Sequence, residues 1–558
     1  MPTCLNAWCR QHFEISDTDL EFYEKVSPVF KERRELVPPP TLCPGCRMQR
    51  RFSHRNERHL YRRHCALSGR PLITIYPPDS PCTVYDKESW WGENWDPLTF
   101  GRSFSESEDF FSQFQSLRTT VPRLGTIDTN DEGSAYCSFC AFTKHCYLCT
   151  SCVVNENSLH CYQANDSRDC CDCYRVTGCE LCYECIHCHG LNSCQHCKDC
   201  DTGSGLLFCD DCRGCNDCIG CKNLVNKSHW INNAPSTGEQ VEALKTALRN
   251  HSELLRTEEN FRSYARTLTT RASHLVQCEN CTGDHLRNCR NTVNSYDAIN
   301  LEDCSFMVPV PQGAKDCRDA HYCPNAELLY ECLSGVRANR CLFSLYVWDD
   351  DDMLYSEECF SCKHCFGCVG LRHKQYCVLN KQYMKAEYEE LVPRIIGHMR
   401  KTNEWGEFLS AHSSFFPYNL SIAQEDFPLT QHDVETRGWH WRVQTDEIPN
   451  VDHIIPAAQL PDRIDQIPDD ILNWAIECDA TKRPFRIIKQ ELDFYRQMHV
   501  PVPRFHPDER HRRRMALRNP RKLWKRNCGK CGKEMETTYS PERPEIVYCE
   551  SCYLKEVY

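Results

Sequence analysis

The spacing of apolar residues along the chain predicts few helices and many short β segments. Apolar residues at helical spacing, set among good helix formers, predict helices over 240–249 and 386–400. The first of these continues as a charged helical stretch to about residue 273. Between residues 137 and 221, short runs of Cys, Tyr and Leu with few helix formers favour β structure instead.

The cysteines of this middle region repeat every 24 residues. They form three columns: Cys137, Cys161, Cys185 and Cys209; Cys146, Cys170, Cys194 and Cys218; Cys149, Cys173, Cys197 and Cys221. A fixed period between 20 and 50 residues is typical of stacked repeats. We therefore predict a β-solenoid of about four coils, with neighbouring coils ~4.8 Å apart.

Such a stack can bring CxxC pairs of neighbouring coils around one zinc ion. The predicted ligand sets are Cys146, Cys149, Cys170 and Cys173, and Cys194, Cys197, Cys218 and Cys221. One alternative is a metal-free ladder of buried thiols, because free Cys packs as a small apolar residue. Another is an iron–sulfur protein, since Cys209 to Cys221 recur every third residue, although the last gap and the Cys-Pro of bacterial ferredoxins are missing.

The middle region is duplicated at an offset of 147. For example, Cys212, Cys215, Cys218 and Cys221 recur as Cys359, Cys362, Cys365 and Cys368. The second copy has Ala320 and Ser344 at positions where metal ligands are needed, so we expect it to be largely metal-free. The two predicted helices follow the copies and are expected to cap their open ends.

The two ends of the chain are copies of one module at an offset of 463. Matching pairs include Arg47 and Arg510, Arg51 and Arg514, Cys65 and Cys528, Thr74 and Thr537, and Val84 and Val547. Further upstream the offset becomes 472, where Phe13–Tyr23 matches Phe485–Tyr495. Each end is therefore expected to fold in the same way.

Each copy retains a different set of four cysteines. The first keeps Cys4, Cys9, Cys43 and Cys46, and the second keeps Cys528, Cys531, Cys549 and Cys552. The second set has the CxxC-x17-CxxC spacing of a zinc ribbon, in which tight turns aim thiolates at one tetrahedral ion. The matching positions are degenerate: Cys65, Ser68, Asp86 and Ser89 in the first copy, and Cys478, Thr481, His506 and Glu509 in the second.

The run V-P-P-P-T-L-C-P-G-C-R-M-Q-R-R at 37–51 resembles the second knuckle of a probable zinc-ribbon family that carries P-x-x-C-x-x-C-R-x-x-R. The strings R-N-E-R-H-L-Y-R-R-H-C-A-L-S-G and W-W-G-E-N-W-D-P are similar to uncharacterised Cys-rich proteins predicted from genomes of candidate-phyla bacteria. The resemblance covers most of the chain. It implies zinc and brings no established activity.

The composition favours metal over disulfides as the role of the cysteines. There are 45 of them in 558 residues, the number is odd, and the first residues lack the basic and apolar regions of a signal peptide. No apolar run reaches the ~18 residues that a membrane span needs. We therefore expect a soluble, cytoplasmic protein without membrane partners, and zinc as its cofactor.

The net charge of −12 is unevenly distributed. Residues 500–533 carry 12 Lys and Arg against Asp508 and Glu509, and residues 47–63 carry seven Arg against Glu57. Arginine suits phosphate, so nucleic acid is one possible partner of the basic strips 47–63 and 504–533. Alternatively, the strips dock on a protein or on the acidic remainder of this chain. The candidate contacts are Arg510, Arg512, Arg513, Arg514, Arg518, Arg521, Lys525 and Arg526.

We expect a mainly β protein with short helices, in which zinc-ribbon modules flank a duplicated Cys-rich region. The predicted segments are 1–100 and 476–558 for the modules, 137–275 and 276–400 for the repeat units, and 101–136 and 401–475 for the linkers. The leading hypothesis is a zinc-stabilised scaffold that binds protein partners. The alternatives are a nucleic-acid- or ribosome-associated protein and a metal-dependent enzyme or iron–sulfur protein. Val451–Pro456 resembles the core of a nuclease, but the later Asn and His that such a site needs are not correctly placed, and this pattern is common in loops.

Overall fold

The computed structural model describes residues 1–302, 351–444, 449–451 and 453–557; between 303 and 350 it describes 304, 314, 315, 317, 318, 328, 330, 331, 333–335, 342, 343 and 345–347. The positions Ala320, Ser344 and Asp452 lie outside these residues. The protein is a mixed α/β chain in which helices accompany many small sheets, and it contains more helix than predicted.

The helices are α1 Asp17–Val26, α2 Pro44–Phe52, α3 Lys87–Trp91, α4 Phe110–Thr120, α5 Gly238–Ala247, α6 His251–Ala265, α7 Lys385–Lys401, α8 Ala423–Asp426, α9 Gln431–Thr436, α10 Lys489–Met498, α11 Pro507–Leu517 and α12 Glu550–Val557. Short 3-10 turns are η1 Pro97–Phe100, η2 Ala411–Ser413, η3 Tyr418–Leu420, η4 Ala457–Gln459, η5 Ile464–Gln466 and η6 Asp469–Asn473. The predicted helices 240–249 and 386–400 are thus confirmed as α5 and α7.

The strands are short. In the first half of the middle region they are β7 Asp128–Thr129, β8 Cys140–Ala141, β9 His189–Asn192, β10 Asp201–Ser204, β11 Arg213–Asn216, β12 Trp230–Ile231 and β13 Ala234–Pro235. In its second half they are β15 Leu275–Val276, β16 Gly283–Arg287, β17 Ser295–Ile299, β18 Leu301–Glu302, β19 Ala314–Lys315, β20 Leu333–Ser334, β21 Leu345–Val347, β22 Asp351–Leu354, β23 Lys363–Phe366, β24 Gln375–Val378 and β25 Lys381–Gln382.

The remaining strands belong to the ends of the chain and to the segments that pair with them. They are β1 Val29–Phe30, β2 Arg33–Arg34, β3 Tyr61–His64, β4 Pro71–Thr74, β5 Val84–Tyr85, β6 Arg123–Leu124, β14 Thr269–Arg271, β26 His453–Pro456, β27 Trp474–Glu477, β28 Pro484–Phe485, β29 Trp524–Asn527, β30 Glu534–Thr537 and β31 Ile546–Tyr548.

Residues 128–231, which we call the first stack, form a parallel ladder with a register of twelve residues. Ala135 bridges Tyr147, Tyr147 bridges Leu159, and Leu159 bridges Cys171. The predicted period of one layer per 24 residues is therefore wrong, because residues 24 apart lie two layers apart. The described residues of 275–378, which we call the second stack, mostly have the same register, as in the pairing of β22, β23 and β24.

Each layer of the first stack is built from three-residue units. In one such unit Cys149 is fully buried, Thr150 bridges the layers before and after it, and Ser151 is left-handed with φ of 53°. The left-handed position recurs every third residue, and Asp, Asn and Gly often occupy it because they tolerate that conformation best. The turn chemistry thus sets the three-residue spacing, and the buried position of each unit is the one that holds Cys.

Cysteines fill the interior of the first stack, together with a few residues such as Val176, Leu191 and Leu206. Their thiols lie near backbone carbonyls of their own layer and of the next one. The Cys149 sulfur, for example, is 3.7 Å from the Tyr147 oxygen and 3.2 Å from the Ser158 oxygen. Because a free thiol is small and a weak donor, it fits a narrow interior lined by carbonyl groups.

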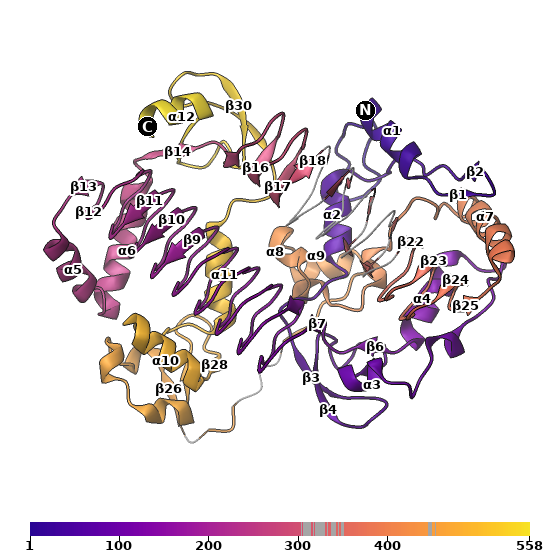
Figure 1. Cartoon of the computed structure of the whole chain (residues 1–558), viewed down its shortest axis with the longest axis horizontal. Coiled ribbons are helices and arrows are strands. Elements are labelled where there is room, and N and C mark those ends of the chain that lie inside the picture. Colours follow the sequence, from indigo (N-terminus) through magenta and orange to yellow (C-terminus); the bar gives the residue numbers. More distant parts are fainter. Residues whose placement is uncertain are drawn as a thin grey trace.

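Each stack is covered by the module from the opposite end of the chain (Figure 1). Leu159, Cys171 and Tyr183 of the first stack pack against Leu492 and Tyr495 of α10. In the second stack, Tyr330, Leu333 and Leu342 share a core with Phe22, Tyr23 and Val26 of α1. We call the first stack with the C-terminal module the first lobe, and the second stack with the N-terminal module the second lobe.

Residues that match in sequence make matching contacts in the two lobes. The ring of Tyr23 meets Tyr330 edge-on at 5.0 Å, and Tyr495 meets Tyr183 edge-on at 6.1 Å. Likewise β5 pairs with β6 through Val84 and Arg123, while β31 pairs with β14 through Val547 and Thr270. These pairs obey the offsets of 463, 472 and 147 found in the sequence, so the two lobes are assembled in the same way.

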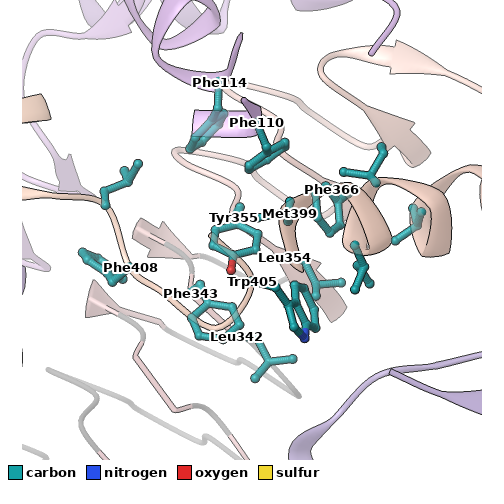
Figure 2. Close-up of a cluster of buried hydrophobic side chains, with 14 of the residues drawn as sticks. Phe110, Phe114, Leu342, Phe343, Leu354, Tyr355, Phe366, Met399, Trp405 and Phe408 are labelled. Atoms are coloured by element: carbon teal, nitrogen blue, oxygen red, sulfur yellow. The ribbon is translucent and has the colours of Figure 1, made fainter. Parts of the chain in front are cut away.

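The segments that lead into the stacks also cross between lobes. Helix α4 precedes the first stack but packs in the second lobe, where the Phe110 ring lies 5.4 Å from Tyr355 and 5.1 Å from Phe366. Figure 2 shows Phe110 and Phe114 above Tyr355, with Met399 and Trp405 in the same cluster. Helix α6 precedes the second stack but packs on Phe208 of the first through Phe261.

The predicted segment boundaries stay predictions. Within them, the segment 101–136 contains α4 and β6, and the segment 401–475 contains α8 and α9. Helix α5 follows β13 and packs Val241 and Leu248 against Phe208 and Ile219 near the end of the first stack.

Candidate metal centres

The N-terminal quartet is Cys4, Cys9, Cys43 and Cys46, whose sulfurs all lie within 4.8 Å of one another. Cys4 and Cys9 lie in a turn closed by the bridge from Thr3 to His12. Cys43 is the N-cap of α2, and Pro44 starts the helix so that Cys46 falls in its first turn. The helix start therefore aims two thiols at the turn.

The C-terminal quartet is Cys528, Cys531, Cys549 and Cys552, which meets the same distance limit. Cys528 follows β29 at the tip of the hairpin formed with β30, and its N–H donates to the Lys533 oxygen. Gly532 closes this turn with φ of 73°. Cys549 and Cys552 flank the start of α12, so a hairpin tip and a helix start face each other.

Both quartets have the dimensions of a tetrahedral thiolate site. The Cys9 and Cys43 sulfurs are 3.8 Å apart, as are those of Cys531 and Cys549. Four sulfurs at ~2.3 Å from one ion are ~3.8 Å apart, whereas a disulfide is ~2.05 Å long. Each quartet also contains one thiol that ionises readily: the hydrogen bond from Cys46 lowers the pKa of Cys43 to about 5. For Cys528, backbone N–H groups outweigh burial and lower the pKa to about 6.

In the N-terminal module, hydrogen bonds occupy the place of the second quartet. Cys65, Ser68, Asp86 and Ser89 match the C-terminal ligands by position. The Ser68 hydroxyl donates to Asp86 at 2.6 Å, and Ser89 donates to it through its N–H and its hydroxyl at 2.8 and 2.9 Å. The carboxylate of Asp86 thus joins the two halves of this module without an ion.

The central cysteines are distributed differently from the prediction. Cys146 and Cys149 lie two layers from Cys170 and Cys173, as do Cys194 and Cys197 from Cys218 and Cys221. Within the described residues, neither quartet gathers its sulfurs within 4.8 Å. Cys209, Cys212, Cys215, Cys218 and Cys221 occupy successive buried positions, each beside backbone carbonyls. The geometry favours the thiol ladder over shared ions.

Much of the C-terminal basic strip points into the protein. Arg510 and Arg514 are buried and pair with Asp172, the latter at 2.8 Å. Arg518 and Arg521 both pair with Asp426, at 2.8 and 2.7 Å. Arg526 donates to backbone oxygens of residues 540 and 545. Arg512, Arg513 and Lys525 face solvent and pair locally with Glu509 or Glu534.

The N-terminal basic strip is bound in the same way. Arg50 pairs with Glu331 and Glu407, both at 2.7 Å, and Arg47 reaches Glu331 at 4.0 Å. Glu331 matches Glu184, which pairs with Arg514 at 3.6 Å in the first lobe. A matching glutamate of each stack thus pairs with an arginine of the module that covers it, although the arginines stand at different positions in the two copies.

Sequence reasoning missed a further group that can hold a metal: His187, Asp199 and His285, with His274 and Asp284 beside them. No motif links these residues, because His187 and His285 are 98 positions apart. The sequence signal that could have brought His187 and Asp199 together is the twelve-residue register, because Asp199 follows His187 by one layer.

No helix among the described residues is long and apolar enough to cross a membrane. No protein-family model and no curated protein matches the chain. The fold and the two quartets define a class: a cysteine-rich α/β protein whose terminal modules each gather four thiols that can bind a metal ion. The resemblance to the zinc-ribbon proteins of candidate-phyla bacteria stays a prediction.

Proposed function

We propose that this protein is a zinc-stabilised cytoplasmic scaffold, made of two β-solenoid lobes that terminal zinc-ribbon modules hold closed. The observation that carries the proposal is the position of the quartets. Each lies in a module whose neighbouring helices are fixed to a stack by buried ion pairs, such as Arg514 with Asp172 and Arg50 with Glu331. A metal that orders the module therefore also stabilises the lobe.

Zinc is the metal that best suits the two quartets. All four donors are sulfur, the spacing is tetrahedral, and no donor position is left open, which is the composition of structural zinc sites. Zinc in such a site contributes directly to folding because the unfolded chain has no preformed site. In the reducing cytoplasm the remaining thiols stay reduced.

A protein partner fits the exposed side of the first stack. Phe142 and Val154 are twelve residues apart, so they are neighbours on successive layers, and their exposed fractions are 57% and 50%. Exposed aromatic and aliphatic side chains that gather on one face are typical of protein interaction sites.

The nucleic-acid alternative has less support from the geometry. Phosphate contacts need exposed cations, and Arg510, Arg514, Arg518 and Arg521 are occupied by carboxylates. Retention on RNA that weakens as salt rises, and that Lys525→Ala reduces, would favour this alternative.

Two single substitutions test the stabilising role of the quartets. Cys531→Ser should remove one zinc per chain and increase hydrogen exchange in α11 and the first stack. Cys46→Ser should remove one zinc and increase exchange in α1, α2 and the second stack. Cys281→Ser is the matched control, a partly exposed cysteine outside both quartets. Loss of zinc with unchanged exchange in both lobes would refute the proposal.

A further inference from the structure

Two columns of polar side chains face each other where the first stack meets the start of the second. On the first stack, His187, Asp199 and Asp211 follow one another at intervals of twelve residues, all in the left-handed position. On the second, His285 and Asp297 do the same. The ring of His274 is stacked on His285 with centroids 4.6 Å apart.

Three atoms of these columns form a triangle of the size that one metal ion requires. The His187 Nδ1 and His285 Nε2 atoms are 2.9 Å apart, and each is 3.6 Å from Asp199 Oδ1. A point equidistant from all three lies about 2.0 Å from each of them, which matches Zn–N and Zn–O bond lengths.

The group is buried and incompletely hydrogen-bonded. The side chains of His187 and Asp199 are 8% and 4% exposed. Within the described residues, Asp199 Oδ1 and His187 Nε2 have no hydrogen-bond partner. A buried carboxylate oxygen without a donor is costly, and this oxygen points at the two imidazoles. A hydrogen bond between the imidazoles alone would leave it unsatisfied, whereas a cation between the three atoms would satisfy it.

The surroundings can support a bound cation. The Lys198 ammonium pairs with the other oxygen of Asp199 at 3.2 Å, which fixes the carboxylate. Asp297 lies 3.9 Å from His187 Nε2 and can orient that ring. A small cavity lined by His187, His285, Tyr296 and Arg518 adjoins the group. Three protein ligands beside a cavity of this size leave a coordination position for one water molecule.

The group is not a by-product of the duplication. At the offset of 147, the residues that match His187 and Asp199 are Ser334 and Tyr346, and neither supplies a comparable ligand. The group, which lies where the two stacks meet, is therefore not repeated at this offset.

We propose that His187, Asp199 and His285 form a third metal site, which binds a divalent first-row transition ion such as Zn²⁺ with one coordination position open to the cavity. This site is independent of the terminal quartets, because it uses nitrogen and oxygen donors and lies between the two stacks.

Elemental analysis of the full-length protein after equilibration with Zn²⁺ and removal of free metal tests the proposal. Wild type should hold one equivalent more than Asp199→Asn and one more than His285→Gln. His189→Gln is the matched control, a half-exposed histidine that pairs with Asp201 at 3.2 Å, and it should keep the wild-type content.

Cobalt substitution separates this site from the quartets and from misfolding. Sulfur-to-cobalt charge-transfer absorption reports the thiolate sites, and it should be the same in wild type and Asp199→Asn. Asp199→Asn should bind one cobalt ion fewer per chain. The only absorption that it should lose is the weaker bands of a site with nitrogen and oxygen ligands. Equal metal content in wild type and both variants would overturn the proposal. If the quartets do not bind metal, the wild-type protein should show no sulfur-to-cobalt charge-transfer absorption, but it should still bind the one cobalt ion of the third site.

Discussion

Replacing Asp172 by asparagine should loosen the C-terminal module from the first stack. Asp172 is fully buried in the left-handed position of a first-stack unit, where it accepts a hydrogen bond from Arg510 and forms an ion pair with Arg514 at 2.8 Å. Although burial raises the pKa of this carboxyl, the two guanidinium groups lower it below its ordinary value, so the group is ionised at neutral pH. The substitution keeps the shape and removes the charge.

The expected loss of stability follows from the two buried arginines that the substitution leaves without the charge of their carboxylate partner. The Arg510 and Arg514 side chains are 2% and 3% exposed, so neither can be solvated in place. Breaking a buried ion pair by removing one partner costs about 3–5 kcal/mol. Glu491 and Glu184 remain 3.6 Å from the two arginines and offset part of this, so we expect about 3 kcal/mol.

Hydrogen exchange in α11 measures this loss where it occurs. A cost of about 3 kcal/mol corresponds to about a 100-fold decrease in protection. Arg512→Ala on the same helix is the control, since its side chain is 68% exposed and its pair with Glu509 should contribute at most about 1 kcal/mol. Protection of α11 that changes less than threefold in Asp172→Asn would show that the buried pair does not hold the module.

Four further changes test other parts of the structure. Chelation of metal under reducing conditions should lower the melting temperature of both lobes, and zinc, but not magnesium, should restore it. Combining Ser68→Cys, Asp86→Cys and Ser89→Cys with the native Cys65 should add one bound zinc per chain, unlike the same changes combined with Cys65→Ser. In the second lobe, burial opposes the ionisation of Glu357, but Arg118 and Arg123 lower its pKa to about 2. A lowered pKa stabilises the fold above about pH 4.5 and less as the pH falls toward 2, so Glu357→Gln should reduce the stability difference between pH 7 and pH 2 by about 3 kcal/mol, measured by urea unfolding. After the zinc is removed, a thiol reagent should modify the exposed Cys531 of the folded protein, but it should modify interior cysteines, such as Cys185, only after unfolding. Rapid reaction of Cys185 would contradict the packed interior.

The spacing of the cysteines allowed two interpretations in the middle of the chain. A CxxC pair has the spacing of a zinc knuckle and also of two neighbouring three-residue units, each with one buried residue. The first and third columns chosen from the sequence are one column with a period of twelve residues, because Cys137, Cys149, Cys161 and their successors to Cys221 occupy every layer, whereas Ser158 and Leu206 interrupt the second column. The left-handed positions, often Asp, Asn or Gly, carried the missing information, since they recur every third residue.

The sequence alone determined the features that depend on near neighbours. Tight turns and helix starts bring Cys528 and Cys531, or Cys43 and Cys46, together because three residues span one turn, and the quartets were predicted correctly as groups. The helices α5 and α7 follow from helical spacing of apolar residues, and the offsets of 147, 463 and 472 follow from comparison of the chain with itself.

Only the tertiary structure decided which parts meet across long separations. The N-terminal module packs on the second stack and the C-terminal module on the first, and nothing local to Tyr23 or Tyr495 specifies this exchange. The basic strips illustrate the same limit: their charge is evident in the sequence, but Asp172 and Glu331 turn them inward. His187 and His285 meet only because two stacks lie side by side, and contacts of that kind depend on how whole surfaces fit together rather than on spacing along the chain.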